Sequence, residues 1–312
     1  MMEQEIIPEI SIIMGVYNPG NYRYLEASVQ SILNQTFKNF EFIIYDDGSH
    51  AEAAHIIKKL QLKDKRIRII RCDTNHGLAF SLNQCIGVAK GKYLARMDDD
   101  DISFPQRLER EYAFLETHPE YDWVGCNALI LSDSEIVGIR KMAEIPNQYN
   151  FLPFSPYVHP SVMFRRELFE QGNKYNISQE TLRCEDYELF MKLYQQGYLG
   201  YNIQECLFVY RENLASYHRR TVKSRWCEMK IRRNNFCKIG LPRGKRMLYI
   251  LRPLFTVLIP RTVIIQYKKI RLRRLNPIQK WEIEQYRQLF EDTVKEGKEH
   301  EWQRSEKTTA KI

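Results

Sequence analysis

The chain has 312 residues, of which 44% are hydrophobic and 28% are charged. This composition excludes a disordered chain and allows one large domain or two smaller ones. The net charge of +8 is uneven, because residues 216–275 contain 18 Lys or Arg and a single acid. That segment therefore carries +17 and the rest of the chain −9. The imbalance predicts that one part of the protein is suited to an anionic surface.

The N-terminal residues and the cysteines indicate a reduced, cytoplasmic environment. No apolar stretch of signal-peptide length precedes Pro8, so we do not expect a secretory signal. The seven cysteines are odd in number and scattered, and no two form a C-x-x-C pair. We therefore expect reduced thiols rather than a zinc site or a disulfide framework.

Strand and helix patterns alternate through the first third of the chain. Short apolar runs, typical of buried strands, lie at residues 9–16, 40–45, 67–71 and 93–97. Segments with helical spacing separate them at residues 24–33, 51–62 and 78–89. This alternation predicts an α/β fold with a mostly parallel sheet and helices on both of its faces.

From Phe104 onward the pattern changes. We expect helices at residues 105–118 and 182–196, and strands at residues 123–131, 158–164 and 207–211, some of them antiparallel. After Ser216 the chain becomes basic and helical. These changes predict a catalytic domain over residues 1–215, with a nucleotide-binding half at 1–103 and an acceptor half at 104–215. Residues 216–312 would form a basic helical C-terminal region.

Polar clusters follow three of the predicted strands. They are Tyr17-Asn18, Asp46-Asp47 and the four acids from Asp98 to Asp101. Ligands of such sheets bind at the carboxyl ends of the strands, so this convergence predicts a nucleotide site. Adjacent carboxylates repel one another, and a hard divalent cation such as Mg²⁺ or Mn²⁺ would neutralise them. The alternative is a solvated acidic loop.

Six segments in chain order resemble family 2 glycosyltransferases of the GT-A fold, the inverting type that builds bacterial cell-surface polysaccharides. The resemblance covers about residues 8–212. The segments are Ser11 to Asn18, Ser31 to Thr36, Asp46 to Ser49, Asn75 to Asn83, Gly91 to Asp98 and Cys184 to Asp186.

The resemblance implies a role for each matching acid. Most of the matching residues would contact the nucleotide of a nucleotide-sugar donor, and this group consists of Tyr17, Asn18, Asp46, Asp47, Asp98 and Asp99. Asp100, together with Asp98, would bind the divalent metal, Mn²⁺ or Mg²⁺. Asp186 would be the catalytic base. Because four acids are consecutive, the sequence does not specify which of Asp98 to Asp101 bind the metal.

Simple chemistry supports part of this assignment. An inverting transfer needs a carboxylate to take the proton of the acceptor hydroxyl. Asp186 lies near the start of a predicted helix, where the helix dipole favours the ionised form. The alternative is that Glu185 and Asp186 only balance the charge of that helix end.

Three other residues have open assignments. His159 and Glu185 could contact the acceptor or the diphosphate, although a lone histidine beside a strand is more often structural. Asn75 precedes a predicted helix, whose N-terminus suits an anionic part of the nucleotide. A turn with a helix cap is the alternative for Asn75.

The basic C-terminal region contains an apolar stretch at residues 247–267. Arg252 and Arg261 lie inside it and make a spanning helix unfavourable. An interfacial segment on an anionic membrane surface is the favoured interpretation. The alternative is a helix that packs on the catalytic domain and exposes a basic face.

These observations predict an enzyme that moves one sugar from a UDP-sugar to a hydroxyl of a glycan or lipid-linked acceptor at the inner face of the membrane. Processive relatives carry Gln-x-x-Arg-Trp after the base, whereas Val222 stands at the Gln position before Arg225-Trp226. Addition of one sugar per encounter therefore fits better. A sugar nucleotidyltransferase would need a Gly-rich loop that residues 11–20 lack. A nucleic-acid binder acting through the basic tail is disfavoured by the acidic sheet edge.

Overall fold

The computed structural model describes residues 7–132, 135–212 and 221–257, together with residues 259, 260, 262–264, 266, 267, 270 and 288. Its first part alternates strand and helix as expected. The elements are β1 (Ile10–Val16), α1 (Tyr22–Leu33), β2 (Phe40–Asp47), α2 (Ala51–Leu60), β3 (Ile67–Cys72), α3 (Leu78–Val88) and β4 (Tyr93–Arg96). The predicted strands and helices of this part are therefore confirmed to within about two residues at their ends.

The second part mixes short and long elements. They are β5 (Ile102–Ser103), α4 (Arg107–Thr117), β6 (Trp123–Ser132), β7 (Glu135–Arg140), η1 (Gln148–Phe151), η2 (His159–Ser161), β8 (Met163–Arg165), α5 (Glu167–Glu170), η3 (Gln179–Thr181), α6 (Glu185–Gln195), β9 (Gly200–Arg211), α8 (Val222–Asn235) and α9 (Arg243–Phe255).

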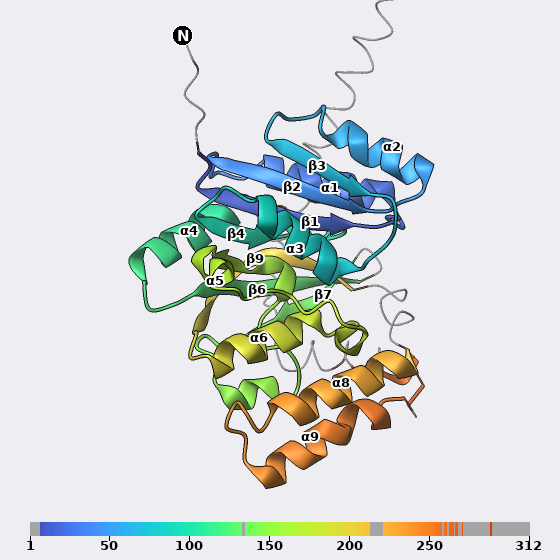
Figure 1. Cartoon of the computed structure of the whole chain (residues 1–312), viewed down its shortest axis with the longest axis vertical. Helices are drawn as coiled ribbons and strands as arrows, with labels where there is room; N and C mark the ends of the chain where they lie inside the picture. The colour runs from blue at the N-terminus through green and yellow to red at the C-terminus, as the bar shows by residue number, and fades with distance from the viewer. Residues whose placement is uncertain are drawn as a thin grey trace, which may run out of the picture.

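All strands of the described residues join one mixed sheet. Its order is β3-β2-β1-β4-β8-β6-β9-β5, with β7 paired to β6. β1 pairs in parallel with β2 and β4, and β2 pairs in parallel with β3. The antiparallel strand β8 joins β4 to β6. Figure 1 shows the β3-β2-β1 end of the sheet opposite to α8 and α9, with α6 between the sheet and these two helices.

Helices cover both faces of the sheet because the parallel strands are apolar on both sides. Ile12 and Met14 of β1 belong to the core that includes Val29 of α1. Ile13 points to the other face and belongs to the core that includes Leu82 of α3. Successive side chains of a strand alternate between faces, so a continuous apolar run buries both. The predicted fold class is confirmed.

One predicted strand is shorter than expected. The sequence predicts a strand over residues 158–164, but residues His159–Ser161 form a turn of 3-10 helix and only Met163–Arg165 pair with β4. Pro160 has no N–H group to donate to a ladder, which explains why the strand begins after it. The short strand β5 and the strand β7 were not predicted.

The two described C-terminal helices share the core of the preceding residues. Phe236 and Ile250 belong to the same buried cluster as Phe151 and Phe190. Arg232 of α8 is buried and donates hydrogen bonds to the carbonyls of Leu152 (2.5 Å) and Pro153 (3.3 Å). The domain boundary at residue 215 stays a prediction, and most of the chain after α9 lies outside the described residues.

A buried amide connects α1 to the segment that follows the four aspartates. Gln35 donates to the carbonyls of Ser31 (3.0 Å) and Phe104 (2.8 Å) and to the hydroxyl of Ser103 (3.1 Å), and it accepts from the backbone N–H of Leu108 (3.0 Å). Its side chain therefore uses all of its donors and an acceptor without water.

We expect Gln35→Leu to lower the free energy of unfolding by about 2–4 kcal/mol, because it leaves several buried backbone groups unpaired. Denaturant unfolding measures the change. Gln61→Leu is the control, since Gln61 is exposed at the end of α2 and its replacement should cost less than about 0.5 kcal/mol. Equal effects of the two substitutions would contradict the role given to Gln35.

Candidate functional site

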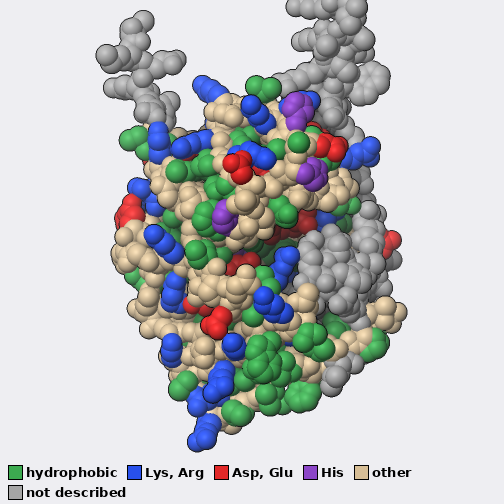
Figure 2. All heavy atoms as spheres, turned by 45° about the vertical axis from the view of Figure 1, so that its right-hand side comes forward, with side chains coloured by type: hydrophobic (Ala, Val, Ile, Leu, Met, Phe, Trp, Pro, Cys, Tyr) green, Lys and Arg blue, Asp and Glu red, His purple; other side chains and the backbone are tan. Residues whose placement is uncertain are grey.

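The structure brings the three polar clusters to the same edge of the sheet, as the parallel strand order requires. β1, β2 and β4 are neighbours and run in the same direction. Tyr17 and Asn18 therefore lie next to Asp46 and Asp47, and the loop from Asp98 follows on the other side of β1. Figure 2 shows acidic side chains in a hollow across the middle of the molecule.

Asp46 ends β2 in a buried position and organises the turn that follows. Its carboxylate accepts the backbone N–H of Ser49 (3.0 Å) and forms an ion pair with Arg71 of β3. The guanidinium of Arg71 also donates to the carbonyl of Ser49 (2.9 Å). Asp46 is therefore held inside the protein by the turn after β2 and by Arg71 of β3.

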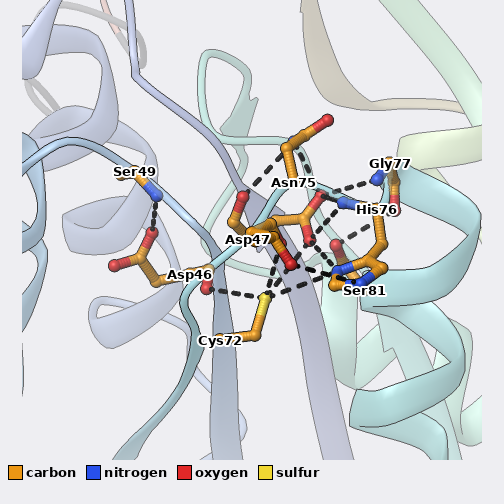
Figure 3. Close-up of polar contacts among 9 residues, drawn as sticks. Asp46, Asp47, Ser49, Cys72, Asn75, His76, Gly77 and Ser81 are labelled. Atoms are coloured by element: carbon orange, nitrogen blue, oxygen red, sulfur yellow. Dashed lines mark hydrogen bonds and ion pairs between the residues drawn. The ribbon is translucent and has the colours of Figure 1, made fainter.

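Asp47 caps the helix α3 from another strand. Its carboxylate accepts the backbone N–H groups of His76 (3.0 Å) and Gly77 (2.7 Å) and the side-chain amide of Asn75 (2.8 Å). Gly77 is the N-cap of α3 and has no side chain to do this. The anion at this helix N-terminus is thus the chain's own carboxylate (Figure 3). Asn75 lies in this turn, and its contact with the nucleotide stays a prediction.

Gly48 allows this close approach. It adopts φ +75°, and a Cβ atom there would lie 2.6 Å from the backbone of Thr74. Only glycine fits such a position without strain. The turn after β2 therefore lies directly against the turn after β3.

The loop after β1 is joined to the loop after β2. The backbone N–H of Asn18 donates to the Ser49 hydroxyl (3.0 Å), and the Asn18 side chain accepts the N–H of His50 (2.9 Å). Asn18 has φ +42°, a conformation that asparagine tolerates better than most residues. The neighbouring Tyr17 is half exposed, so its ring faces solvent at the same edge.

The four consecutive acids do not lie in equivalent positions. Carboxylate oxygens of Asp98, Asp100 and Asp101 lie within 4.8 Å of one another. Asp101 is fully buried and accepts the backbone N–H of Arg211 (2.7 Å), and the carbonyl of Asp100 accepts from the Arg211 side chain (2.8 Å). Three close oxygen donors fit Mg²⁺ or Mn²⁺. Sequence reasoning proposed Asp98 and Asp100 for a metal but gave Asp101 no such role.

Burial and mutual repulsion disfavour the charged forms of these acids. Burial, with the charges of Asp100 and Asp98, raises the pKa of Asp99 to about 7. The same causes raise the pKa of Asp101 well above its usual range. A bound cation would favour the charged forms and lower both pKa values. The acid cluster is therefore arranged for a positive partner.

Arg96, the last residue of β4, supplies one positive charge next to the acid cluster. Its side chain is buried and lies 2.5 Å from a carboxylate oxygen of Asp98. Burial, the largest single effect, opposes its charge, but Asp98, Tyr175 and Asp101 together outweigh burial and raise the pKa of Arg96. Arg96 stands two residues before the acids in the sequence, so it can be expected to face the same edge or to pair with the acids, and the structure confirms the pairing.

The start of α6 faces the same buried charges. Glu185 and Asp186 lie in its first turn. Burial, followed by the charge of Asp186, raises the pKa of Glu185 to about 7. Burial raises the pKa of Tyr175, and the charges of Arg96, Asp186 and Asp98 also act on it. Tyr175 thus interacts electrostatically with acids from both groups, the four aspartates and the start of α6.

His159 is buried behind this group. Its Nε2 atom lies 2.7 Å from the hydroxyl of Tyr175. Burial and the charge of Arg96 lower the pKa of His159 well below its usual range. Its ring is therefore neutral at pH 7 and is held by the tyrosine.

The comparisons with known proteins agree with this geometry. The family model described as "Glycosyl transferase family 2" matches residues 11–172. The chain is 35% identical over 266 residues to "Putative glycosyltransferase EpsE" of Bacillus subtilis (strain 168), which covers 85% of this chain and 95% of the relative. It is 29% identical over 240 residues to "UDP-Glc:alpha-D-GlcNAc-diphosphoundecaprenol beta-1,3-glucosyltransferase WfaP" of Escherichia coli, covering 77% and 90%.

A solved structure shows the same fold. The mannosyltransferase PcManGT from Pyrobaculum calidifontis, in complex with GDP-Man and Mn²⁺, superposes with a TM-score of 0.57 at 14% identity, covering 93% of this chain and 87% of that one. The fold and the site therefore define a nucleotide-sugar-dependent transferase of the GT-A class. Together with the family model, this shows that the chain belongs to glycosyl transferase family 2.

We expect the buried neutral His159 to make the fold sensitive to acid. Because its folded pKa lies below that of the unfolded chain, near 6.5, its contribution is present above pH 6.5 and is lost as the pH falls. Between pH 7.5 and 5.5 this loss should reach about 1.4 kcal/mol. Denaturant unfolding of the wild type and of His159→Asn at both pH values measures it.

The control for this measurement is His55→Asn, since His55 is exposed on α2. The control should lose as much stability as the wild type when the pH is lowered, and His159→Asn should lose less. A wild-type-like loss in His159→Asn would show that His159 is not the group responsible.

Proposed function

We propose that the protein is an inverting glycosyltransferase that moves one sugar from a UDP-sugar to a hydroxyl of a glycan or lipid-linked acceptor in cell-surface polysaccharide synthesis. The observation that carries this proposal is the placement of two acid groups around Arg96 and Tyr175. One group follows β4 and the other begins α6. A transfer with inversion needs a site for the leaving diphosphate and a separate base, and these two groups can supply them.

The donor would lie along the strand ends. Tyr17, Asn18 and the turn after β2 would contact the nucleotide, and Asp98 or Asp99 its ribose. The turn residues are already fixed by hydrogen bonds within the protein, so the pocket is rigid before the donor binds. The relative WfaP is named as a transferase that uses UDP-Glc, which supports a uridine nucleotide here.

The metal would be held by Asp100 and Asp98, with Asp101 completing the group. A bound Mn²⁺ or Mg²⁺ would neutralise the charge that develops on the leaving diphosphate. Asp101 holds the loop in place through Arg211, so its carboxylate has a fixed direction.

Asp186 would act as the base that takes the proton of the acceptor hydroxyl. It lies in the first turn of α6, where the helix dipole favours a carboxylate. The adjacent Glu185, whose pKa is about 7, would hold a proton part of the time and could donate a hydrogen bond to the acceptor. We assign His159 a supporting role through Tyr175.

Addition of a single sugar is supported by α8. Val222 begins this helix at the position where processive relatives carry Gln. Arg225 is paired with Glu228 of its own helix at 3.0 Å. An arginine engaged in this way, without the preceding glutamine, does not reproduce the processive motif.

The surface that we propose for contact with a membrane is the exposed face of α9. No helix of the described residues is long and apolar enough to cross a membrane. Four large apolar side chains of α9 are 40–69% exposed, namely Met247, Leu248, Leu251 and Phe255. Arg243, Lys245 and Arg246 begin the same helix. Figure 2 shows hydrophobic and basic side chains gathered at this end of the molecule. Apolar side chains beside basic ones suit the surface of an anionic membrane.

We expect Asp100→Ala and Asp186→Ala to abolish transfer for different reasons. Removal of the base should lower kcat by about 10²–10⁴-fold and leave UDP binding unchanged. Removal of the metal ligand should in addition weaken Mn²⁺-dependent UDP binding. Calorimetry with UDP, and with GDP as the nucleotide control, separates the two effects. Glu120→Ala, which replaces an exposed acid, is the matched control.

Two outcomes would contradict these roles. Equal activity in EDTA and in Mn²⁺ would remove the metal from the proposal. Full activity of Asp186→Ala would remove its role as the base.

A screen of nucleotide sugars in Mn²⁺, read by hydrolysis and by thermal stabilisation, is the experiment that tests the donor class.

We expect Leu248→Asp to reduce binding to anionic liposomes several-fold at low salt, because it places a charge in the apolar face of α9. Co-sedimentation of the full-length protein measures it. Leu62→Asp is the control, since Leu62 is 81% exposed and follows α2, the helix that Figure 1 shows at the opposite end of the molecule from α9. If the wild-type protein stayed wholly in the supernatant, the membrane proposal would be wrong.

A further inference from the structure

A second group of metal-binding side chains lies at the nucleotide edge of the sheet, apart from the four consecutive acids. It consists of Asp47 at the end of β2, Cys72 at the end of β3 and His76 in the loop before α3. Figure 3 shows the carboxylate, the thiol and the imidazole pointing toward one another. Cys72 and His76 are four residues apart in the sequence, and the pairing of β2 with β3 brings Asp47 to them.

The distances between the three donor atoms fit a small tetrahedral ion. The Cys72 sulfur lies 3.5 Å from Asp47 Oδ1 and 3.8 Å from His76 Nδ1, and His76 Nδ1 lies 3.8 Å from Asp47 Oδ1. Zinc bonds of about 2.3 Å to sulfur and about 2.0 Å to nitrogen and oxygen place the donors of a tetrahedral site about 3.3–3.6 Å apart. Shifts of a few tenths of an ångström would therefore complete the site.

Neighbouring groups already orient His76 and Asp47. The other ring nitrogen of His76, Nε2, lies 3.4 Å from the Thr74 hydroxyl. The ring is stacked on Phe80, with 4.4 Å between centroids. Metal-binding histidines usually hold their second nitrogen in this way. Asp47 is fixed by Asn75 and by the backbone of Gly77.

We propose that Asp47, Cys72 and His76 bind a thiophilic divalent cation, with Zn²⁺ as the best match. Binding would remove the proton of the Cys72 thiol to solvent and leave a zinc–thiolate bond, while His76 binds as the neutral ring. A sulfur, a nitrogen and an oxygen donor favour Zn²⁺ over Mg²⁺ and Mn²⁺, which prefer all-oxygen sites. His76 is 44% exposed, so a water molecule can take the fourth position.

Zinc bound at this site would inhibit the enzyme, an expectation that rests on the proposed function. If Asp47 belongs to the nucleotide pocket, a zinc ion bound to it will hinder the nucleotide. Zn²⁺ would then act as an inhibitor that does not compete with Mn²⁺ for the four aspartates.

The test uses the full-length protein with Co²⁺ as a spectroscopic probe of the metal site. We expect one equivalent of Co²⁺ to produce a sulfur-to-metal charge-transfer band, and Zn²⁺ to abolish the band by displacement. Cys72→Ser should lose the band and lower Zn²⁺ affinity by at least about 100-fold, and Thr74→Val should lower it by about 10-fold. Cys237→Ser is the control, since Cys237 is an exposed cysteine elsewhere, and it should keep the band.

The outcomes separate this proposal from the preceding one. A band that persists in Cys72→Ser, or one that disappears only in Cys237→Ser, overturns the site. Circular dichroism and thermal unfolding of Cys72→Ser exclude a folding defect, and His76→Ala provides a second, independent loss of binding. If Zn²⁺ displaces Co²⁺ and abolishes the band yet leaves the Kd for UDP unchanged, the metal site stands and the nucleotide role of Asp47 is wrong.

Discussion

The buried guanidinium of Arg96 is the interaction on which the site depends. Carboxylates from the end of β4 and from the start of α6 gather in a region with little water, where like charges repel strongly. Arg96 is the charge that lets them lie there, since it touches Asp98 and acts on Tyr175, His159 and Glu185. A buried arginine is itself costly unless it is paired. The cation and the acids therefore require one another, and the strand that ends in Arg96 determines where both are placed.

The turns at the sheet edge are also held by carboxylates that pair with a cation or with N–H groups. Asp46 and Asp47 are adjacent in the chain but serve opposite neighbours, with Asp46 paired to Arg71 and Asp47 bound to the N-terminus of α3. Each anion satisfies groups that would otherwise be unpaired. Because these bonds connect three loops, the edge is rigid without any ligand.

Most of the fold could be predicted from the sequence, because each parallel strand is a continuous apolar run and each helix has a regular apolar face. Local patterns could not reveal β5, which is only two residues long and is fixed by its pairing with β9. Pro160 is a local signal for the turn at His159–Ser161, but the hydrogen bond from Arg107 of α4 to the Pro160 carbonyl (3.3 Å) joins residues 53 positions apart. The candidate site divides in the same way. The acids were visible as strand-end clusters, whereas the buried position of Asp101 and its bond to Arg211 depend on a residue 110 positions away. The meeting of Cys72 and His76 with Asp47 likewise needs the register of β2 and β3.

The packing of α8 fixes the distance between Asp186 and the exposed apolar face of α9. Gln195 at the end of α6 donates to Asn235 at the end of α8 (2.9 Å), and Arg232 ties α8 to residues 152 and 153. The helix α6, which carries Asp186 in its first turn, is thus attached to α8, which packs against α9 and its exposed apolar face. If that face rests on a membrane, the height of Asp186 above the lipid is constant. The fixed height would then select acceptors by the distance of their reactive hydroxyl from the bilayer.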